Sequence, residues 1–245
     1  MMISNKIDNG LDYLFDSDND YDIPSLRLDW QANGLVLPAE VWGSIPRSRI
    51  MTGTYLLYNY DDFLNPLWND PTKLLVSGCN NVVEINFSMT KDMPLAVGIY
   101  QLYRKRWLSR FWAEHCGIKL FVDLNVAEKW QQINLLGVPK GWSHYFTQGY
   151  MDFGTELLKT QLELAKIHAG KEDIAFVVYS GGKEIKEWCK NNKAIYVERW
   201  INRGNGKEPV KQEVEMTVVG NKKGFFNLQK PNEEGQLILR RRKEA

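Results

Sequence analysis

Two predicted strands carry polar side chains of the kinds that bind ligands or transfer protons. Glu84, Asn86 and Ser88 alternate along the first strand, and Asp123 and Asn125 lie at the end of the second. Polar groups at buried positions cost about 1 to 3 kcal/mol each unless they find partners. These residues therefore form either a ligand site or a buried hydrogen-bonded network, and the sequence leaves both readings open.

The two carboxylates, Glu84 and Asp123, are the most reactive combination in this set. Strand alternation separates each polar face from an aliphatic face, against which helices should pack. In consecutive parallel strands joined by a right-handed helix, the polar faces would lie side by side at the carboxyl ends, where α/β proteins bind ligands. The pair could act as acid and base or hold a metal. Magnesium is possible because it needs no histidine.

The helix predicted between these strands, at 94–115, adds cations and a phenol. Tyr103, Arg106 and Arg110 fall on an apolar stripe of a helix that is apolar nearly all round. Buried guanidinium groups need acidic or phosphate partners. Tyr103, one turn from Arg106, could anchor an anion or act as a nucleophile toward phosphate. The alternative is a structural role, with the arginines paired to carboxylates of the protein such as Glu84 or Asp123.

A glycine turn near the end of the pattern is the third candidate. Gly181, Gly182 and Lys183 follow an apolar strand and precede a helix. Such a turn presents backbone N–H groups and a helix N-terminus, both of which attract phosphate. The glycine spacing matches neither a Walker A motif nor a dinucleotide fingerprint, so a plain turn is the alternative.

Composition narrows the class of protein. The chain has 245 residues, is 44% hydrophobic and carries a formal net charge of +1, so no global field attracts nucleic acid or membrane. Three widely spaced cysteines argue against a disulfide framework, and three histidines lack the usual zinc spacings. No basic leader and no long apolar run is present. We expect a cytoplasmic protein without a membrane segment.

Predicted strands and helices alternate along the chain, and they must position these residues. Predicted strands lie at 23–27, 54–59, 82–88, 118–125, 143–148, 174–180 and 194–199, and predicted helices at 94–115, 155–168 and 183–191. This pattern is typical of an α/β domain with a mostly parallel sheet of six or seven strands. We expect the sheet to be barrel-like, either as a TIM-type barrel or as an incomplete one. We place this domain at 23–200, after an acidic arm at 1–22.

The segment 201–245 forms a third region. It alternates like a β-hairpin around Gly220 and Asn221, and it ends in a basic run, Arg240 to Lys243. Such a tail could bind phosphates or a protein partner, although most charge runs are solvated tails.

Several short motifs resemble a known family. They are Asn86-Phe87-Ser88, Asp92-Met93-Pro94, Ile99-Tyr100, Tyr103-Arg104 with Arg106-Trp107-Leu108, and Gly137-Val138-Pro139-Lys140-Gly141. Over roughly 23–191 the chain resembles a family of uncharacterised domains found in phages, plasmids and other bacterial mobile elements. The resemblance implies an α/β domain and a mobile-element setting, and it implies no chemistry. Asn86 stands where we would expect an aspartate.

The leading hypothesis from the sequence is a protein that binds a nucleotide or nucleic acid at the carboxyl ends of its strands, in DNA replication or processing. A non-catalytic interaction module, which engages a host or phage protein through the hairpin, is the alternative. A minor alternative is a strand-nicking initiator that uses Tyr100 and Tyr103. The sequence lacks the His-hydrophobic-His metal motif that would position the scissile phosphate.

Overall fold

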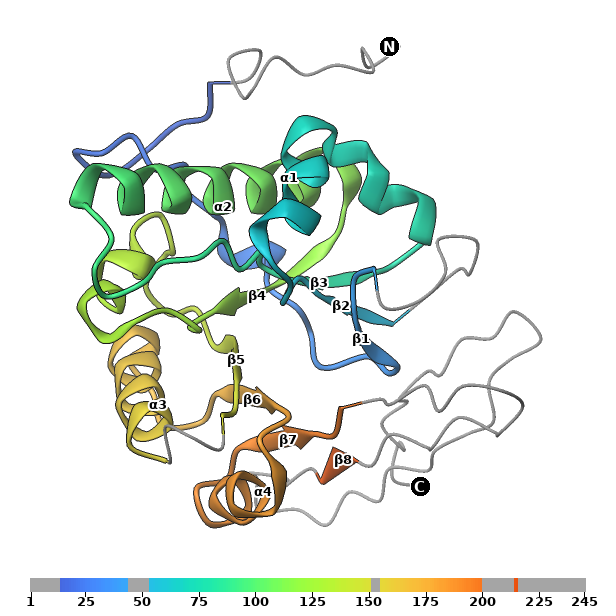
Figure 1. The fold of residues 1–245 in the computed structure, drawn as a ribbon, viewed down its shortest axis with the longest axis vertical. Coiled ribbons are helices and arrows are strands. Elements are labelled where there is room, and N and C mark those ends of the chain that lie inside the picture. Colours follow the sequence, from blue (N-terminus) through green and yellow to red (C-terminus); the bar gives the residue numbers. More distant parts are fainter. Residues whose placement is uncertain (1–13, 44–52, 151–154, 200–213, 216–245) are drawn as a thin grey trace, which may run out of the picture.

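The computed structural model describes residues 14–43, 53–150, 155–199 and 214–215. Within them, seven parallel strands form a nearly closed barrel in the order in which they occur along the chain (Figure 1). The strands are β1 (Ala39–Val41), β2 (Thr54–Leu56), β3 (Asn81–Val83), β4 (Lys119–Asp123), β5 (His144–Gln148), β6 (Ala175–Tyr179) and β7 (Ile195–Val197). An eighth strand, β8 (Val214–Glu215), pairs antiparallel with β7. The predicted α/β, barrel-like fold is confirmed.

Helices lie on the outside of the barrel. They are α1 (Asp61–Asn69), α2 (Leu95–Cys116), α3 (Glu156–Ala169) and α4 (Gly182–Asn191), with short 3₁₀ turns η1 (Leu28–Trp30), η2 (Pro71–Ser77), η3 (Glu128–Trp130) and η4 (Ile133–Leu135). The longest, α2, ends where Gly117 adopts a left-handed conformation (φ 69°), which glycine reaches without steric cost. It crosses one side of the barrel beside α1 (Figure 1).

The core has an inner and an outer part because side chains alternate along each strand. Val83, Phe121, Phe146 and Val177 point inward and fill the barrel. The intervening residues of β4 pack outward, and Val122 belongs to the outer cluster that the helices cover. The inner filling is therefore apolar in the middle of the barrel, which leaves polar chemistry to its ends.

Three elements differ from the sequence prediction. The strand predicted at 23–27 is wrong: only Pro24 makes an isolated bridge, with Ser17, and the chain then enters η1. The first strand of the barrel is β1. It is hard to recognise in the sequence because it is short and contains the charged Glu40. Helix α1 was also missed, because Pro66 inside it reads as a helix breaker.

The ends of the chain are described only in part. Residues 14–22 belong to the predicted arm, and Phe15 packs on Trp107 of α2 at 5.5 Å between ring centroids. Of the predicted hairpin, β8 is described, and the turn at Gly220 and the basic run lie outside the described residues.

Candidate functional site

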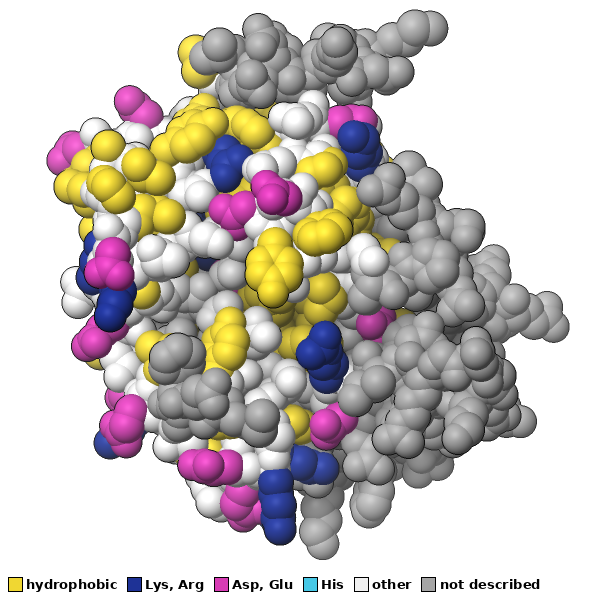
Figure 2. All heavy atoms as spheres, viewed as in Figure 1, with side chains coloured by type: hydrophobic (Ala, Val, Ile, Leu, Met, Phe, Trp, Pro, Cys, Tyr) yellow, Lys and Arg dark blue, Asp and Glu magenta, His cyan; other side chains and the backbone are white. Residues whose placement is uncertain are grey.

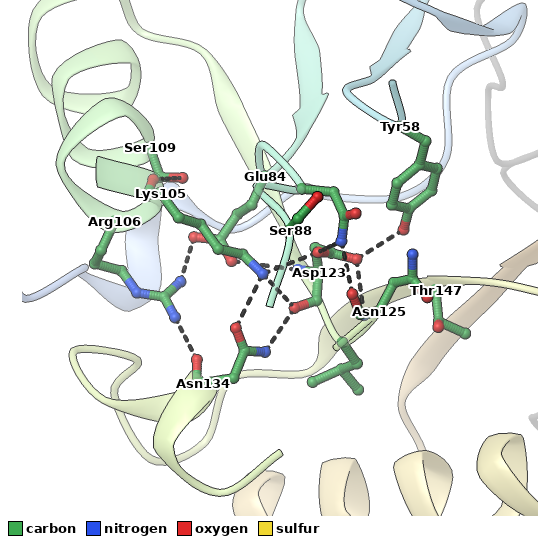
Figure 3. Close-up of polar contacts among 12 residues, drawn as sticks. Tyr58, Glu84, Ser88, Lys105, Arg106, Ser109, Asp123, Asn125, Asn134 and Thr147 are labelled. Carbon is green, nitrogen blue, oxygen red and sulfur yellow. Dashed lines mark hydrogen bonds and ion pairs between the residues drawn. The ribbon is translucent and has the colours of Figure 1, made fainter. Parts of the chain in front are cut away.

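Asp123, the last residue of β4, is the centre of a buried polar network (Figure 3). Its Oδ1 accepts hydrogen bonds from the Tyr58 hydroxyl and the Asn125 backbone N–H, both at 2.9 Å. Its Oδ2 accepts from Asn86 Nδ2 at 2.8 Å and from Lys105 Nζ at 2.9 Å. Four donors from four segments thus converge on one carboxylate that has no exposed surface.

Lys105 is the cation of this network, and sequence reasoning missed it. Besides Asp123 Oδ2, its Nζ donates to the Asp123 carbonyl at 3.0 Å and to Asn134 Oδ1 at 2.9 Å. An ammonium group has three N–H donors, and all three are engaged. The signal was its position beside Arg106 in a helix that is apolar on most sides.

Glu84 and Arg106 form a second buried ion pair next to the first. Glu84 Oε2 also accepts from the backbone N–H of Asp123 at 3.2 Å, which joins the two pairs. Arg106 further donates to the carbonyl groups of Asn134 and Leu136. The negative charges of the two carboxylates equal the positive charges of the two cations. The network therefore has no surplus charge for a ligand.

The placement of Glu84 differs from the sequence prediction. Val83 lies beside Phe121 and faces the barrel interior. Ile85, which the sequence puts on the same face, packs in the cluster that contains Trp107 of α2. Glu84 turns toward α2, whereas Asp123 faces the interior with Phe121. The two carboxylates meet through a backbone N–H and not side by side.

Asn86 and Asn125 extend the network toward the mouth of the barrel. Asn86 Nδ2 donates to the Asn125 carbonyl at 2.7 Å, and Asn125 Nδ2 donates to the Tyr150 hydroxyl at 3.0 Å. Tyr150 donates in turn to Gln148 Oε1 at 3.1 Å. Both predicted amides therefore lie in the same cluster as Asp123.

Three other predicted residues lie elsewhere. Ser88 binds the Asp61 carboxylate through its hydroxyl and its N–H, both at 3.0 Å, and joins α1 to the loop between β3 and α2. Arg110 pairs with carboxylates of the protein, as the structural alternative predicts. Tyr103 is half-buried among apolar residues, and burial raises the pKa of its hydroxyl. None of the three contacts the Asp123 network in the described structure.

The partners of Arg110 explain its burial. Its guanidinium pairs with Asp16 and with Glu114, 2.9 Å away, and it donates to the Ser25 carbonyl at 3.1 Å. The arginine therefore attaches the segment before β1 to α2.

A cavity of about 270 Å³ lies at the carboxyl ends of the strands. Its lining combines two phenols, two amides, a carboxylate and an arginine. The residues are Glu40, Val41, Gly43, Tyr58, Asn59, Gln148, Tyr179 and Arg199. Sequence reasoning did not select these residues. The available signal was position, because Gln148, Tyr179 and Arg199 end or nearly end predicted strands.

The phenols of the cavity keep their protons at neutral pH. Burial raises the pKa of Tyr58 well above 10, and the negative charge of Asp123 adds to this effect. Burial, with a smaller contribution from the negative charge of Glu40, raises the pKa of Tyr179 to about 12, although Arg199 partly opposes this effect. Both phenols therefore act as hydrogen-bonding groups and not as bases.

The predicted glycine turn closely follows Tyr179, which lines this cavity. Gly181 lies against Gly149, which directly follows β5, and the Gly149 N–H donates to the Tyr179 carbonyl at 2.9 Å. Ser180 has a left-handed backbone (φ 65°), a strained conformation that is common near functional sites. Gly182 and Lys183 are exposed at the start of α4. Close packing explains Gly181, whose added Cβ would lie 2.6 Å from Ile185.

A second cavity, of about 460 Å³, lies outside the barrel between α3 and residues 132–140. Leu136, Val138, Leu164 and Ile167 make it mostly apolar, with His168 buried at its edge. None of the residues predicted to do chemistry lines it.

Among the described residues, no group of three or more His, Cys, Asp or Glu side chains could hold a metal ion. The oxygens of Asp123 are already filled by four donors. Within the same part of the chain, no helix is both long and apolar enough to cross a membrane.

The visible surface carries mixed charges. Figure 2 shows acidic and basic side chains interspersed over the described part of this face. Apolar side chains gather near the start of α2, where Leu95, Val97 and Tyr100 are exposed by 55%, 45% and 51%. No single-sign field covers this face, as the net charge predicts.

Together these features define an α/β barrel protein with a charge-balanced buried network beneath a cavity at the carboxyl ends of its strands. Comparison with known proteins identifies its family. Residues 15–145 match the family described as Domain of unknown function (DUF4417), and the chain belongs to it. This confirms the resemblance to an uncharacterised domain family.

A curated relative supports the phage association. The chain is 31% identical over 106 residues to the Gene 1 protein of Mycobacterium phage D29. The match covers 40% of this chain and 37% of that relative. No solved structure matches the chain.

Proposed function

We propose that the carboxyl-end cavity binds a phosphate-bearing ligand, either a nucleotide or a nucleic acid. The observation that carries this proposal is the lining itself, in which Arg199 stands with Tyr58, Tyr179 and two amides at the end of the barrel where such folds bind ligands. Guanidinium groups suit phosphate because their fixed N–H donors match its oxygens.

The turn from Gly181 to Lys183 supports a phosphate position beside this cavity. The start of α4 presents backbone N–H groups and a partial positive charge. Strand β6 leads from Tyr179 in the cavity wall directly into this turn. Barrels often hold phosphate near their last strands, so Arg199 and Lys183 would share the anion.

Under this proposal the buried network holds the site in shape. Glu84, Arg106 and Lys105 have their charges compensated within the protein. Asp123, Asn86 and Asn125 then orient the groups that face the ligand. A role in DNA replication or processing is the corresponding biological proposal, which the phage relative supports by association alone.

Isothermal titration calorimetry of the full chain with inorganic phosphate, AMP and a dT oligonucleotide tests the proposal. We expect binding that Arg199→Gln weakens by about tenfold, since a charged hydrogen bond contributes about 1.5 to 3 kcal/mol. Arg27→Gln is the matched control, because Arg27 is exposed and contacts the exposed Asp29 and the ring of Trp30, away from the cavity lining. Absence of binding for all three probes, with and without magnesium, would refute the proposal.

A further inference from the structure

The direction of the hydrogen bonds beneath the cavity is fixed by Lys105. An ammonium group can only donate, so Asp123 Oδ2, 2.9 Å from Lys105 Nζ, is an acceptor. Its other oxygen receives the Asn125 N–H. Asp123 therefore has no proton to give, and the Tyr58 hydroxyl must donate to it.

This order determines what Tyr58 can offer a ligand. A phenol has one O–H donor, and that of Tyr58 is committed to Asp123. Only the lone pairs of its oxygen remain for another partner. Tyr58 lines the cavity as an acceptor, and a phosphate oxygen, itself an acceptor, is the wrong partner for it.

A second chain of hydrogen bonds orients Gln148. Asn125 Nδ2 donates to the Tyr150 oxygen, and the Tyr150 hydroxyl donates to Gln148 Oε1. Since the amide oxygen of Gln148 faces Tyr150, its NH₂ group is the side that it can turn to a ligand. The cavity thus offers an acceptor at Tyr58, an amide donor at Gln148 and the Arg199 guanidinium. The Glu40 carboxylate, Asn59 and Tyr179 also line it.

We infer that the cavity selects a nucleotide, because its ligand must present a hydrogen-bond donor to Tyr58 in addition to a phosphate for Arg199. This inference rests on the proposed function and deepens it. A base edge has a donor next to an acceptor and fits Tyr58 and Gln148 together. The volume of about 270 Å³ is at the small end of ligand pockets, so it holds a single nucleotide and excludes a duplex.

The donor could come from the base or from the sugar, and the choice of probes separates these sources. Calorimetry on the full chain compares inorganic phosphate, ribose 5-phosphate, AMP and dAMP. Equal affinities for AMP and dAMP, with ribose 5-phosphate much weaker, assign the donor to the base. A weaker affinity for dAMP assigns it to the 2′-hydroxyl group.

Tyr58→Phe tests the inference itself. We expect it to weaken AMP binding by about fivefold to tenfold, the effect of one hydrogen bond, and to leave phosphate binding unchanged. Tyr60→Phe removes the same atom from a side chain that is 79% exposed in the same loop, and it should bind AMP like wild type. Gln148→Leu is the second variant, with the same expected pattern, should Tyr58→Phe fail to fold.

Two results would overturn the inference while the proposed function stands. One is inorganic phosphate binding as tightly as AMP. The other is wild-type AMP affinity in folded Tyr58→Phe and Gln148→Leu. If neither phosphate nor any nucleotide binds, the proposed function fails as well.

Discussion

Lys105 Nζ lies 2.9 Å from Asp123 Oδ2, and the exposed fractions of the two side chains are 1% and 0%. This contact joins the middle of α2 to the end of β4. A buried ion pair is stable only where hydrogen bonds satisfy its remaining donors and acceptors, and here all of them have partners. The pair fixes both the helix position and the direction of the hydrogen bonds under the cavity.

Lys105→Met should destabilise the protein by about 3 to 5 kcal/mol, because it leaves the Asp123 carboxylate buried without its cation. Urea unfolding measures this loss. Adding Asp123→Asn to Lys105→Met should recover part of it, since a neutral amide needs no counter-charge. The exposed pair Arg27 and Asp29 is the control, and Arg27→Ala should cost less than about 1 kcal/mol. Equal losses at the two pairs would contradict this account.

The pair of Glu84 and Arg106 should depend on the shape of the guanidinium group. Arg106 reaches Glu84, Asn134 and Leu136 with separate N–H groups, which a lysine cannot reproduce. We expect Arg106→Lys to be destabilised nearly as much as Arg106→Met, by about 3 kcal/mol or more in urea unfolding. Full rescue by lysine would show that charge alone is needed at this position.

The sequence predicts most of the barrel because apolar runs mark its buried strands. Runs at 118–125, 143–148 and 174–180 contain the whole of β4, β5 and β6. It fails at β1, where three residues including Glu40 are too few to show a period, and at α1, where Pro66 masks a helix. Local pattern identifies long elements and loses short ones.

The sequence predicted the location of the candidate site but not its individual contacts. Asp123, Asn86 and Asn125 come together at the carboxyl ends, as strand alternation indicates. Tyr58 is 65 positions from Asp123 in the chain, so no local pattern links the two residues. Glu84 departs from the expected face because regular strand structure ends at Val83. Tertiary packing therefore decides which polar residues line a cavity and which are sealed beneath it.

His168 should make stability depend on pH. Burial lowers its pKa from 6.5 to about 4, and the positive charge of Lys140 contributes. Between these values the unfolded chain binds a proton that the folded protein does not, so this contribution is complete above pH 6.5. It is lost as pH falls toward 4, by at most about 3 kcal/mol.

Urea unfolding at pH 7.5, 6 and 5 measures this dependence. His168→Gln should flatten the decline, whereas His115→Gln, at an exposed position, should keep it. The buried carboxylates contribute equally to the pH dependence of stability in all three proteins. The same decline in His168→Gln as in wild type would show that another group carries the effect.

Gly149 should be required for the wall between the cavity and the glycine turn. An added Cβ would lie 2.5 Å from the Ser180 carbonyl oxygen and 2.9 Å from Ile185 Cγ2. Because backbone is the nearest obstacle, Ser180 and Gly181 must shift to admit a methyl group. We expect Gly149→Ala to lower the free energy of unfolding by about 1 to 3 kcal/mol and to weaken phosphate binding.

Gly170→Ala is the control for Gly149→Ala, since Gly170 needs its left-handed conformation (φ 66°) but has open space around an added Cβ. It should cost about 1 kcal/mol and bind phosphate like wild type. If both variants bind phosphate equally well, the turn from Gly181 to Lys183 takes no part in the site.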